Sequence, residues 1–414
     1  MNWLNRVNVH LSKKIGAIYV IKGFFKIIEE NGMDQYNETE LEQCVVQLQT
    51  KLEEDPKNID LRNKLAITFM ELNEYEKAVK EFEIAAKIDP NIQTLQNLAE
   101  FYFTEGKLIE KDEDLVDEKK EDVINQSTEE ASENDNEEEV ISSFEEADKE
   151  ALAILKTLLA ENPKHYFPYN LIAEIYIKEE KYDEAIDVLK KAINIKPTLE
   201  NLHNLGLCYY KKDLLTEASE SFYKASLLRS DVNNSTFPLL SYGVCLAKLG
   251  RKEEAKTVAE QLFLISKEED EEDDWFGYSD DIADIYYFMD DFQEFVNVYR
   301  RLDWTFYSVQ HLPAYFYALW RLLNTKEIDK IAKEFIRAKE EEIREALAES
   351  PEKIEYDQKE FEEETREEII FIKETVKRVC GGERPKAIFE PYVETRCYLF
   401  GCFRHGNPNP NYVE

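Results

Sequence analysis

The chain has 414 residues, of which 43% are hydrophobic and 34% charged, and its formal net charge is -36. This excess of negative charge repels a phosphate backbone and disfavours direct binding to nucleic acid, while the low content of glycine and proline predicts an all-α protein. The six scattered cysteines do not suit a disulfide framework and predict a cytoplasmic location.

Residues 2–30 are predicted to form one amphipathic helix, because apolar side chains recur at every third or fourth position. Its charged residues as far as Ile28 are all basic: Arg6, Lys13, Lys14, Lys22 and Lys26. Such a helix can lie on an anionic membrane surface, or it can pack on the first helix pair and cover the end of a helical array. With a second helix predicted from Thr39 to Glu54, residues 1–56 form an N-terminal amphipathic helix and a diverged opening helix pair.

The clearest pattern lies between Tyr166 and Ala225, where two copies of one helix-pair pattern follow each other. Small residues occupy equivalent positions in the two copies, where two helices must approach closely. These equivalent pairs are Ala173 and Gly206, Ala185 and Ala218, and Ala192 and Ala225. Prolines close the units at a regular interval, since Pro163 and Pro197 are 34 residues apart, as are Pro56 and Pro90.

This pattern resembles the tetratricopeptide repeat, a helix-turn-helix unit of about 34 residues. The resemblance implies a right-handed α-solenoid of tetratricopeptide-like helix pairs over residues 57–265. Weaker copies predict degenerate helix pairs over residues 266–350.

One interval between prolines is too long for a single repeat, since Pro90 and Pro163 are 73 residues apart. The excess is an acidic insertion at about residues 110–146, which we expect to be disordered because it can bury little apolar surface. It splits one repeat at the turn between its two helices. Two interpretations stay open: a solvated loop without further function, or a segment that attracts basic partner proteins or covers the binding groove.

Residues 351–414 predict a long charged helix and an aromatic, cysteine-bearing tail that is not part of a repeat. In this region Cys380, Cys397, Cys402 and His405 have a spacing that can hold zinc. Alternatively, the tail folds back as a C-terminal cap and its cysteines serve as apolar residues. We favour the cap and predict neither a metal nor another cofactor.

The resemblance also implies a binding groove, because stacked tetratricopeptide repeats hold an extended or helical peptide on the face formed by the first helix of each pair. The residues that this face should carry are Ile67, Met70, Gln96, Glu100, Phe103, Asn170, Glu174, Ile177, His203, Leu207, Tyr210, Leu240 and Val244. None of them is Lys or Arg, which favours an apolar or aromatic-rich peptide over a carboxylate-ended one. The alternative occupant is the chain's own C-terminal segment.

Sequence motifs of nucleotide-binding loops, zinc proteases and serine hydrolases are absent, so no catalytic residue is assigned. We therefore predict a non-enzymatic scaffold or adaptor that binds a partner protein or peptide. Two alternatives remain: an acidic chaperone or decoy that binds basic, nucleic-acid-handling proteins through the insertion, and a peripheral membrane adaptor that binds through residues 1–30.

Overall fold

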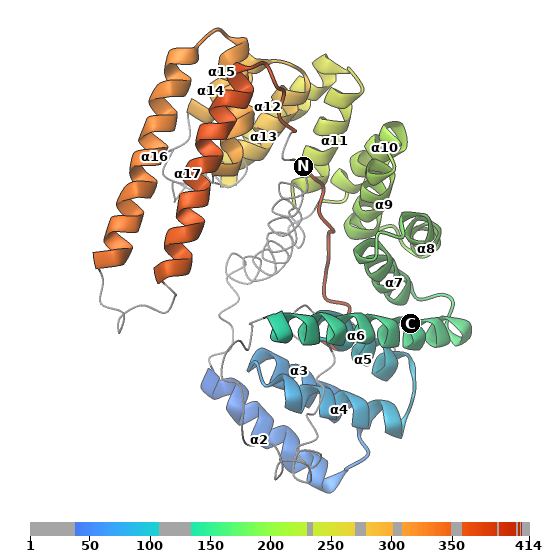
Figure 1. The fold of residues 1–414 in the computed structure, drawn as a ribbon. Coiled ribbons are helices and arrows are strands. Elements are labelled where there is room, and N and C mark those ends of the chain that lie inside the picture. Colours follow the sequence, from blue (N-terminus) through green and yellow to red (C-terminus); the bar gives the residue numbers. More distant parts are fainter. Residues whose placement is uncertain are drawn as a thin grey trace. The chain divides into compact units, whose positions relative to one another are not determined.

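The computed structural model describes residues 38–106, 134–229, 235–269, 279–300, 309–348, 358–386, 389–402, 405 and 407 (Figure 1). In these ranges the chain forms helices joined by turns and extended segments, and no strand occurs among them. The chain divides into two compact units, one made of residues 1–168 and 397–414 and the other of residues 169–396. None of the described helices is long and apolar enough to span a bilayer.

The first unit is built from helices that each pack on the next in sequence. They are α2 (Glu38–Glu54), α3 (Ile59–Glu71), α4 (Tyr75–Ile88), α5 (Ile92–Glu105) and α6 (Asn134–Glu161). Its core contains Leu65, Phe82, Phe101 and Leu155, each at most 2% exposed. The predicted helix over residues 2–30 lies outside the described residues.

Helix α6 begins at Asn134, inside the range of about 110–146 that the sequence assigned to the insertion. Its second half presents Ala147, Ala151, Leu155 and Leu158 on one buried stripe. Glutamates precede this stripe in the sequence, and Glu favours helix. Residues 107–133 lie outside the described part of the chain, and their predicted disorder stays a prediction.

The second unit continues the same arrangement, in which successive helices pack on one another from α8 to α15 and α17 packs on both α15 and α16. Its helices, the first of which begins at the unit boundary, are α7 (Tyr166–Lys178), α8 (Tyr182–Ile195), α9 (Leu199–Lys211), α10 (Leu215–Ser226), α11 (Phe237–Lys248), α12 (Lys252–Glu269), α13 (Ser279–Phe288), α14 (Phe292–Arg300), η3 (Val309–His311), α15 (Leu312–Arg321), α16 (Thr325–Ala348) and α17 (Gln358–Cys380). The two units thus share one construction, consecutive helices in pairs.

A common turn ends the first helix of each pair, with one residue in the left-handed region. Its φ is 58° at Glu180 and 59° at Asp213, and it is 60° at Asp290 and 59° at Leu323. At the first of these turns the amide of Lys181 donates to the carbonyl of Tyr176 at 2.8 Å, which satisfies a carbonyl at the helix end. The turn recurs at Asp290 and Leu323, where the sequence pattern is weak. Helix pairs are therefore present even where the repeat motif is degenerate.

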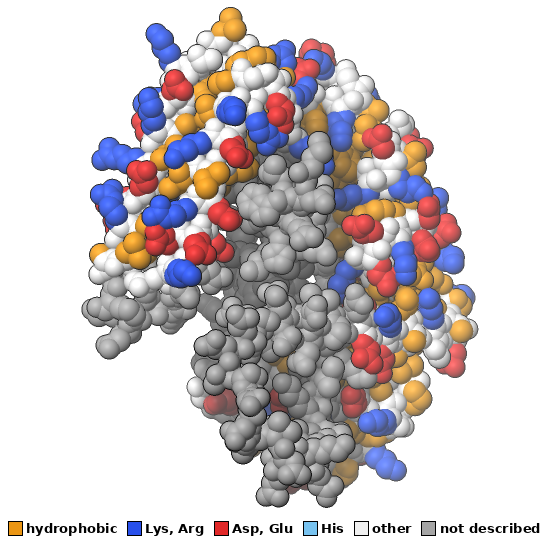
Figure 2. Space-filling model, in the orientation of Figure 1, with side chains coloured by type: hydrophobic (Ala, Val, Ile, Leu, Met, Phe, Trp, Pro, Cys, Tyr) orange, Lys and Arg blue, Asp and Glu red, His pale blue; other side chains and the backbone are white. Residues whose placement is uncertain are grey.

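The helices α16 and α17 carry many ion pairs on their solvent side. Acidic and basic side chains alternate along them on the face that Figure 2 shows. Lys339 of α16 lies 2.8 Å from Glu342 on the same helix and 3.0 Å from Glu368 on α17. Partly exposed pairs of this kind each contribute little to stability.

The small residues predicted at the helix crossings lie where the structure leaves least space. A Cβ atom built on Gly206 of α9 would come within 2.7–2.9 Å of the ring of Phe222 on α10, which is fully buried. The equivalent Ala173 of α7 is also fully buried. A side chain at position 206 would therefore collide with this ring.

Replacement of Gly206 by alanine should lower the free energy of unfolding by about 1–3 kcal/mol, because the added methyl group must displace a ring with no free space beside it. Urea unfolding followed by circular dichroism measures the change. The matched control is Glu220→Ala on α10, an exposed position at which the loss should stay within about 0.5 kcal/mol. Equal stability of the two variants would contradict the close packing.

Candidate functional site: the first-helix faces and the C-terminal segment

The residues predicted to line a groove are covered in the structure. Met70, Phe103 and Tyr210 are half-buried, and the other ten are buried. We use the term first-helix face for the surface that α5 forms in the first unit. In the second unit the term means the surface that α9, α11 and α13 form. We call residues 384–407 the C-terminal segment. Binding of a partner at these predicted residues stays a prediction, but the structure shows what lies on several of them.

In the second unit the C-terminal segment runs extended over α9 and is held through its backbone. The amide of Glu394 donates to Asn204 Oδ1 at 2.9 Å, and Asn204 Nδ2 donates to the carbonyl of Glu394 at 2.8 Å. One residue earlier in the helix, His203 Nε2 lies 3.0 Å from the carbonyl oxygen of Tyr392. Because a carbonyl only accepts, the proton is on Nε2. The carboxamide of Asn204 therefore pairs with both backbone groups of one residue, as a residue of a neighbouring antiparallel strand would.

Burial keeps this imidazole neutral. His203 is fully buried, and burial lowers its pKa to about 3, although the hydrogen bond to Tyr392 opposes the shift. A neutral imidazole leaves no uncompensated charge under the segment. His203 thus serves as a hydrogen-bond donor to backbone and not as a titrating group near neutral pH.

Aromatic side chains of the segment pack on the beginning of α11. Phe389 stacks on Phe237 with ring centroids 5.9 Å apart and lies edge-on to Tyr210 at 6.2 Å. The ring centroid of Tyr392 is 3.7 Å from that of Phe237. Two predicted groove residues, His203 and Tyr210, are therefore in contact with the chain's own segment.

The start of the segment is held by polar and cationic contacts at α13. Arg384 lies 2.9 Å from Asp290 and places its guanidinium 5.0 Å from the centre of the Tyr287 ring. The hydroxyl of Tyr287 donates to the carbonyl of Pro385 at 2.9 Å. Further along, Glu390 pairs with Lys211 at 3.0 Å. Both ion pairs are at least partly exposed, so they fix position more than they add stability.

In the first unit the segment makes the same backbone contact on α5. Asn97 Nδ2 donates to the carbonyl of Phe400 at 3.0 Å, and the amide of Phe400 donates to Asn97 Oδ1 at 2.7 Å. The predicted groove residue Glu100 accepts a hydrogen bond from the amide of Tyr398 at 2.9 Å. The rings of Tyr398 and Phe400 pack on Phe167 at 5.3 and 5.0 Å.

Asn97 and Asn204 occupy the same position of the repeat pattern. Each lies two residues before the small residue of its helix, Ala99 in α5 and Gly206 in α9. Their neighbours Gln96 and His203 were predicted from the sequence, but the two asparagines were not. Both asparagines stand at the same repeat position, on a helix face that a repeat array buries, and this recurrence of a polar residue could have identified them.

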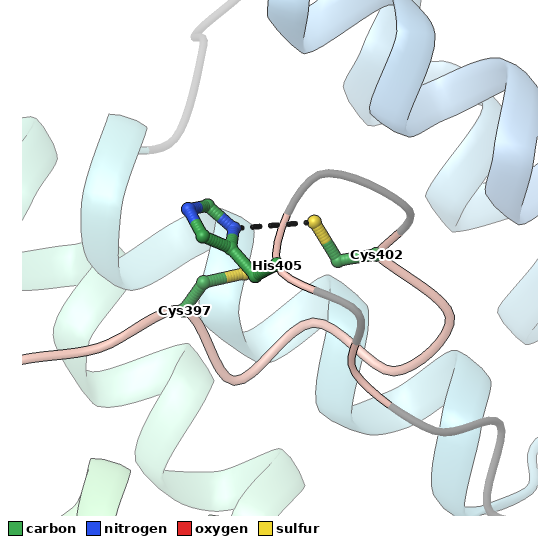
Figure 3. Close-up of side chains that lie close together, drawn as sticks. All are labelled: Cys397, Cys402 and His405. Carbon is green, nitrogen blue, oxygen red and sulfur yellow. Dashed lines mark hydrogen bonds between the residues drawn. The ribbon is translucent and has the colours of Figure 1, made fainter. Parts of the chain in front are cut away.

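A cluster of thiols and an imidazole lies at the end of the segment (Figure 3). The ligand atoms of Cys397, Cys402 and His405 all lie within 4.8 Å of one another, and Cys402 Sγ is 3.3 Å from His405 Nδ1. Hydrogen bonding from Cys397 and then the contact with His405 lower the pKa of the Cys402 thiol. The fourth candidate, Cys380, ends α17 of the second unit, is exposed, and does not belong to this group.

A buried carboxyl group lies beside Asn204. Burial raises the pKa of Glu394 to about 7, the charge of Glu200 adds to the shift, and a hydrogen bond from Ser235 opposes it. Glu394 was not among the site residues predicted from the sequence. Glu394 therefore changes charge close to neutral pH at the point where the segment is clamped.

The fold and its faces define a class: an all-α protein of consecutive helix pairs that holds an extended segment against the first helices. Two stretches match models of one family, residues 59–92 as a tetratricopeptide repeat and residues 173–213 as a TPR repeat. The chain therefore contains tetratricopeptide repeats. Repeats of this family support a general role as a protein-interaction scaffold. Among curated protein sequences, none matches the chain significantly.

Solved structures of several tetratricopeptide repeat proteins are similar to parts of the chain. A protein from Parabacteroides merdae ATCC 43184 is 15% identical, with 78% of this chain and 99% of that chain covered and a TM-score of 0.42. TTC0263 from Thermus thermophilus is 18% identical, with 46% and 84% covered and a TM-score of 0.33. MamA from Desulfovibrio magneticus RS-1 is 17% identical, with 53% and 93% covered and a TM-score of 0.32. At these scores the assignment depends on the two repeat matches.

Replacement of Asn204 by alanine should release the segment from α9. The change leaves the amide and carbonyl of Glu394 buried without partners, at a cost of about 1–3 kcal/mol for each group. Hydrogen exchange measured by mass spectrometry should show faster exchange of peptides that contain residues 392–396. Asn97→Ala should do the same for residues 398–402. The matched control is Asn194→Ala at an exposed position of α8, and unchanged exchange in both test variants would refute the clamp.

Glu394 should make the stability fall as the pH rises from 4.5 to about 7. In this window the carboxyl ionises in the unfolded chain while it stays protonated in the folded one, which removes on the order of 3 kcal/mol. Glu394→Gln should abolish this loss and raise the melting temperature at pH 8 relative to the unsubstituted protein. His203 contributes an opposite slope between pH 3 and 6.5 that is common to both proteins.

The matched control for this pH dependence is Glu390→Gln, an exposed carboxyl of the same segment. Its melting temperature should follow the unsubstituted protein at every pH. A Glu394→Gln variant with the same pH profile as this control would show that the buried carboxyl does not titrate in the window.

Proposed function

We propose that this chain is a non-enzymatic, cytoplasmic interaction scaffold whose first-helix faces bind an extended, aromatic-rich segment of a partner protein. In this proposal the C-terminal segment is the resident occupant, and a partner segment displaces it. The observation that carries the proposal is the pair of identical backbone contacts that Asn97 and Asn204 make.

Contacts to backbone support exchange of one segment for another. A carboxamide that bonds the amide and the carbonyl of the same residue recognises the backbone of that residue and makes no contact with its side chain through these bonds. Any extended segment can therefore make these bonds in place of Glu394 or Phe400. Affinity and register must come from side chains, as in other modes of peptide recognition.

The side-chain contacts indicate the chemistry of such a partner segment. Aromatic residues fill the sites that Phe389, Tyr398 and Phe400 occupy, since all three are buried. A basic residue suits the site of Arg384, which combines the carboxylate of Asp290 with the face of Tyr287. The best-fitting ligand is an extended segment that begins with a basic residue and carries several aromatic residues.

The alternatives from the sequence gain no support from the described helices. An acidic chaperone would act through the insertion and a membrane adaptor through residues 2–30, and residues 107–133 and 1–37 lie outside the described part of the chain.

The proposal can be tested with the whole chain and a single cut. A protease site inserted after Gly382, which is exposed, allows the folded protein to be nicked while residues 383–414 stay in place. A fluorescein-labelled peptide of residues 383–414 should then exchange into the nicked protein, with a rise in anisotropy, and should not bind the uncut chain.

Peptide variants serve as controls. A peptide with Phe389→Ala and Phe400→Ala should bind at least ~100-fold more weakly, because two buried rings are lost. A peptide with Lys386→Ala, an exposed position, should bind as the original does. Failure of the labelled peptide to enter a nicked protein that remains helical would refute an exchangeable site on these faces.

A further inference from the structure

We infer that Cys397, Cys402 and His405 form a zinc site at the end of the C-terminal segment, with a fourth coordination position open to water or to a donor atom of a partner. The inference stands on the geometry of the cluster and is independent of what the first-helix faces bind.

The donor atoms are arranged as the corners of a zinc site. In a tetrahedral site with Zn–S bonds near 2.3 Å and Zn–N bonds near 2.0–2.1 Å, neighbouring donors lie about 3.5–3.8 Å apart. Here Cys402 Sγ and His405 Nδ1 are 3.3 Å apart, and all three donor atoms lie within 4.8 Å. Figure 3 shows the three side chains close together. Small movements of flexible side chains bring all three into bonding range.

The backbone around the cluster is closed by hydrogen bonds that need no metal. Asn407 Nδ2 donates to the carbonyls of Cys397 at 2.8 Å and Leu399 at 3.1 Å, and the amide of Asn407 donates to the carbonyl of Cys402 at 3.1 Å. The same Nδ2 lies 3.6 Å from Cys397 Sγ, the kind of outer contact that supports a metal-bound thiolate. These hydrogen bonds hold Cys397, Leu399 and Cys402 next to Asn407 without an ion.

Burial and charge around the cluster also suit a cation. Cys402 is buried and Cys397 partly buried, while His405 is exposed, so an ion would be held from one side and reached from the other. Glu100 accepts a hydrogen bond from the amide of Tyr398, next to Cys397, which places a carboxylate close to the site. Two thiols and one imidazole are a donor set that suits zinc among the common divalent ions.

Three protein ligands leave one tetrahedral position unfilled, which distinguishes this site from a closed structural one. Cys380 is not among the clustered donors, so the site as inferred does not use it. The competing fate of the two thiols is a disulfide between Cys397 and Cys402, which would remove both ligands.

The experiment measures metal in the full chain, purified in reducing buffer without a chelator. Elemental analysis by mass spectrometry should find about one zinc per chain. Replacement of the zinc by Co²⁺ should give the strong visible absorption of a tetrahedral site and a thiolate-to-cobalt charge-transfer band. His405→Gln, at an exposed position, should keep the helical content and melting curve of the helices, weaken zinc binding at least ~10-fold, and shift the cobalt spectrum.

Cysteine variants supply the controls. Cys402→Ser should lose the thiolate-to-cobalt intensity, whereas Cys44→Ser on α2 and Cys380→Ser on α17 should keep zinc and the spectrum unchanged. Absence of stoichiometric zinc and of a cobalt spectrum in the reduced chain would overturn the inference. A Cys397–Cys402 disulfide that persists in reducing buffer, or loss of zinc in Cys380→Ser, would overturn it as well.

Discussion

A segment of extended backbone buried against helices has peptide groups that no helix or sheet satisfies, and this constraint governs the structure. Buried amides and carbonyls must be paired, because an unpaired one costs as much as a lost hydrogen bond. The chain meets the demand with side chains placed on the first helices. Asn97 and Asn204 each form hydrogen bonds with both the amide and the carbonyl of one residue of the segment. Glu100 and His203 each form a hydrogen bond with one backbone group. These four buried polar side chains are thereby accounted for.

The same faces also explain the burial of aromatic residues in a segment without regular secondary structure. Phe389, Tyr398 and Phe400 are at most 6% exposed, although none of them belongs to a helix. Each depends on rings contributed by the helices or the residues that precede them, such as Phe237 and Phe167. The aromatic tail is therefore part of the folded core of each unit. The sequence predicted that the tail forms a cap, and the structure shows it as a segment held along the first helices.

The sequence predicted what depends on local spacing. Small residues such as Gly206 and Ala218, and the regular prolines, identified the helix pairs, because close helix contacts leave few choices of side chain. The pairing of Asn97 with Phe400 and of Asn204 with Glu394 joins residues 303 and 190 positions apart, and no local pattern contains it. The raised pKa of Glu394 follows from that pairing and was beyond prediction for the same reason. The proximity of Cys397, Cys402 and His405 in space was left open by their spacing in the sequence.

The distance along the chain between the helices and the segment also has a consequence for synthesis. At roughly 5–20 residues per second, the ribosome reaches Phe400 about 15–60 s after Asn97, a separation of 303 residues. During that time the first helices can form, but the face that Tyr398 and Phe400 will cover remains bare in the nascent chain. The asparagines and the other polar residues of that face can bond water in the interval. The polar side chains can thus keep the uncovered face hydrated until the C-terminal segment has been synthesised. This suits a protein whose first helices fold well before the segment that covers them is made.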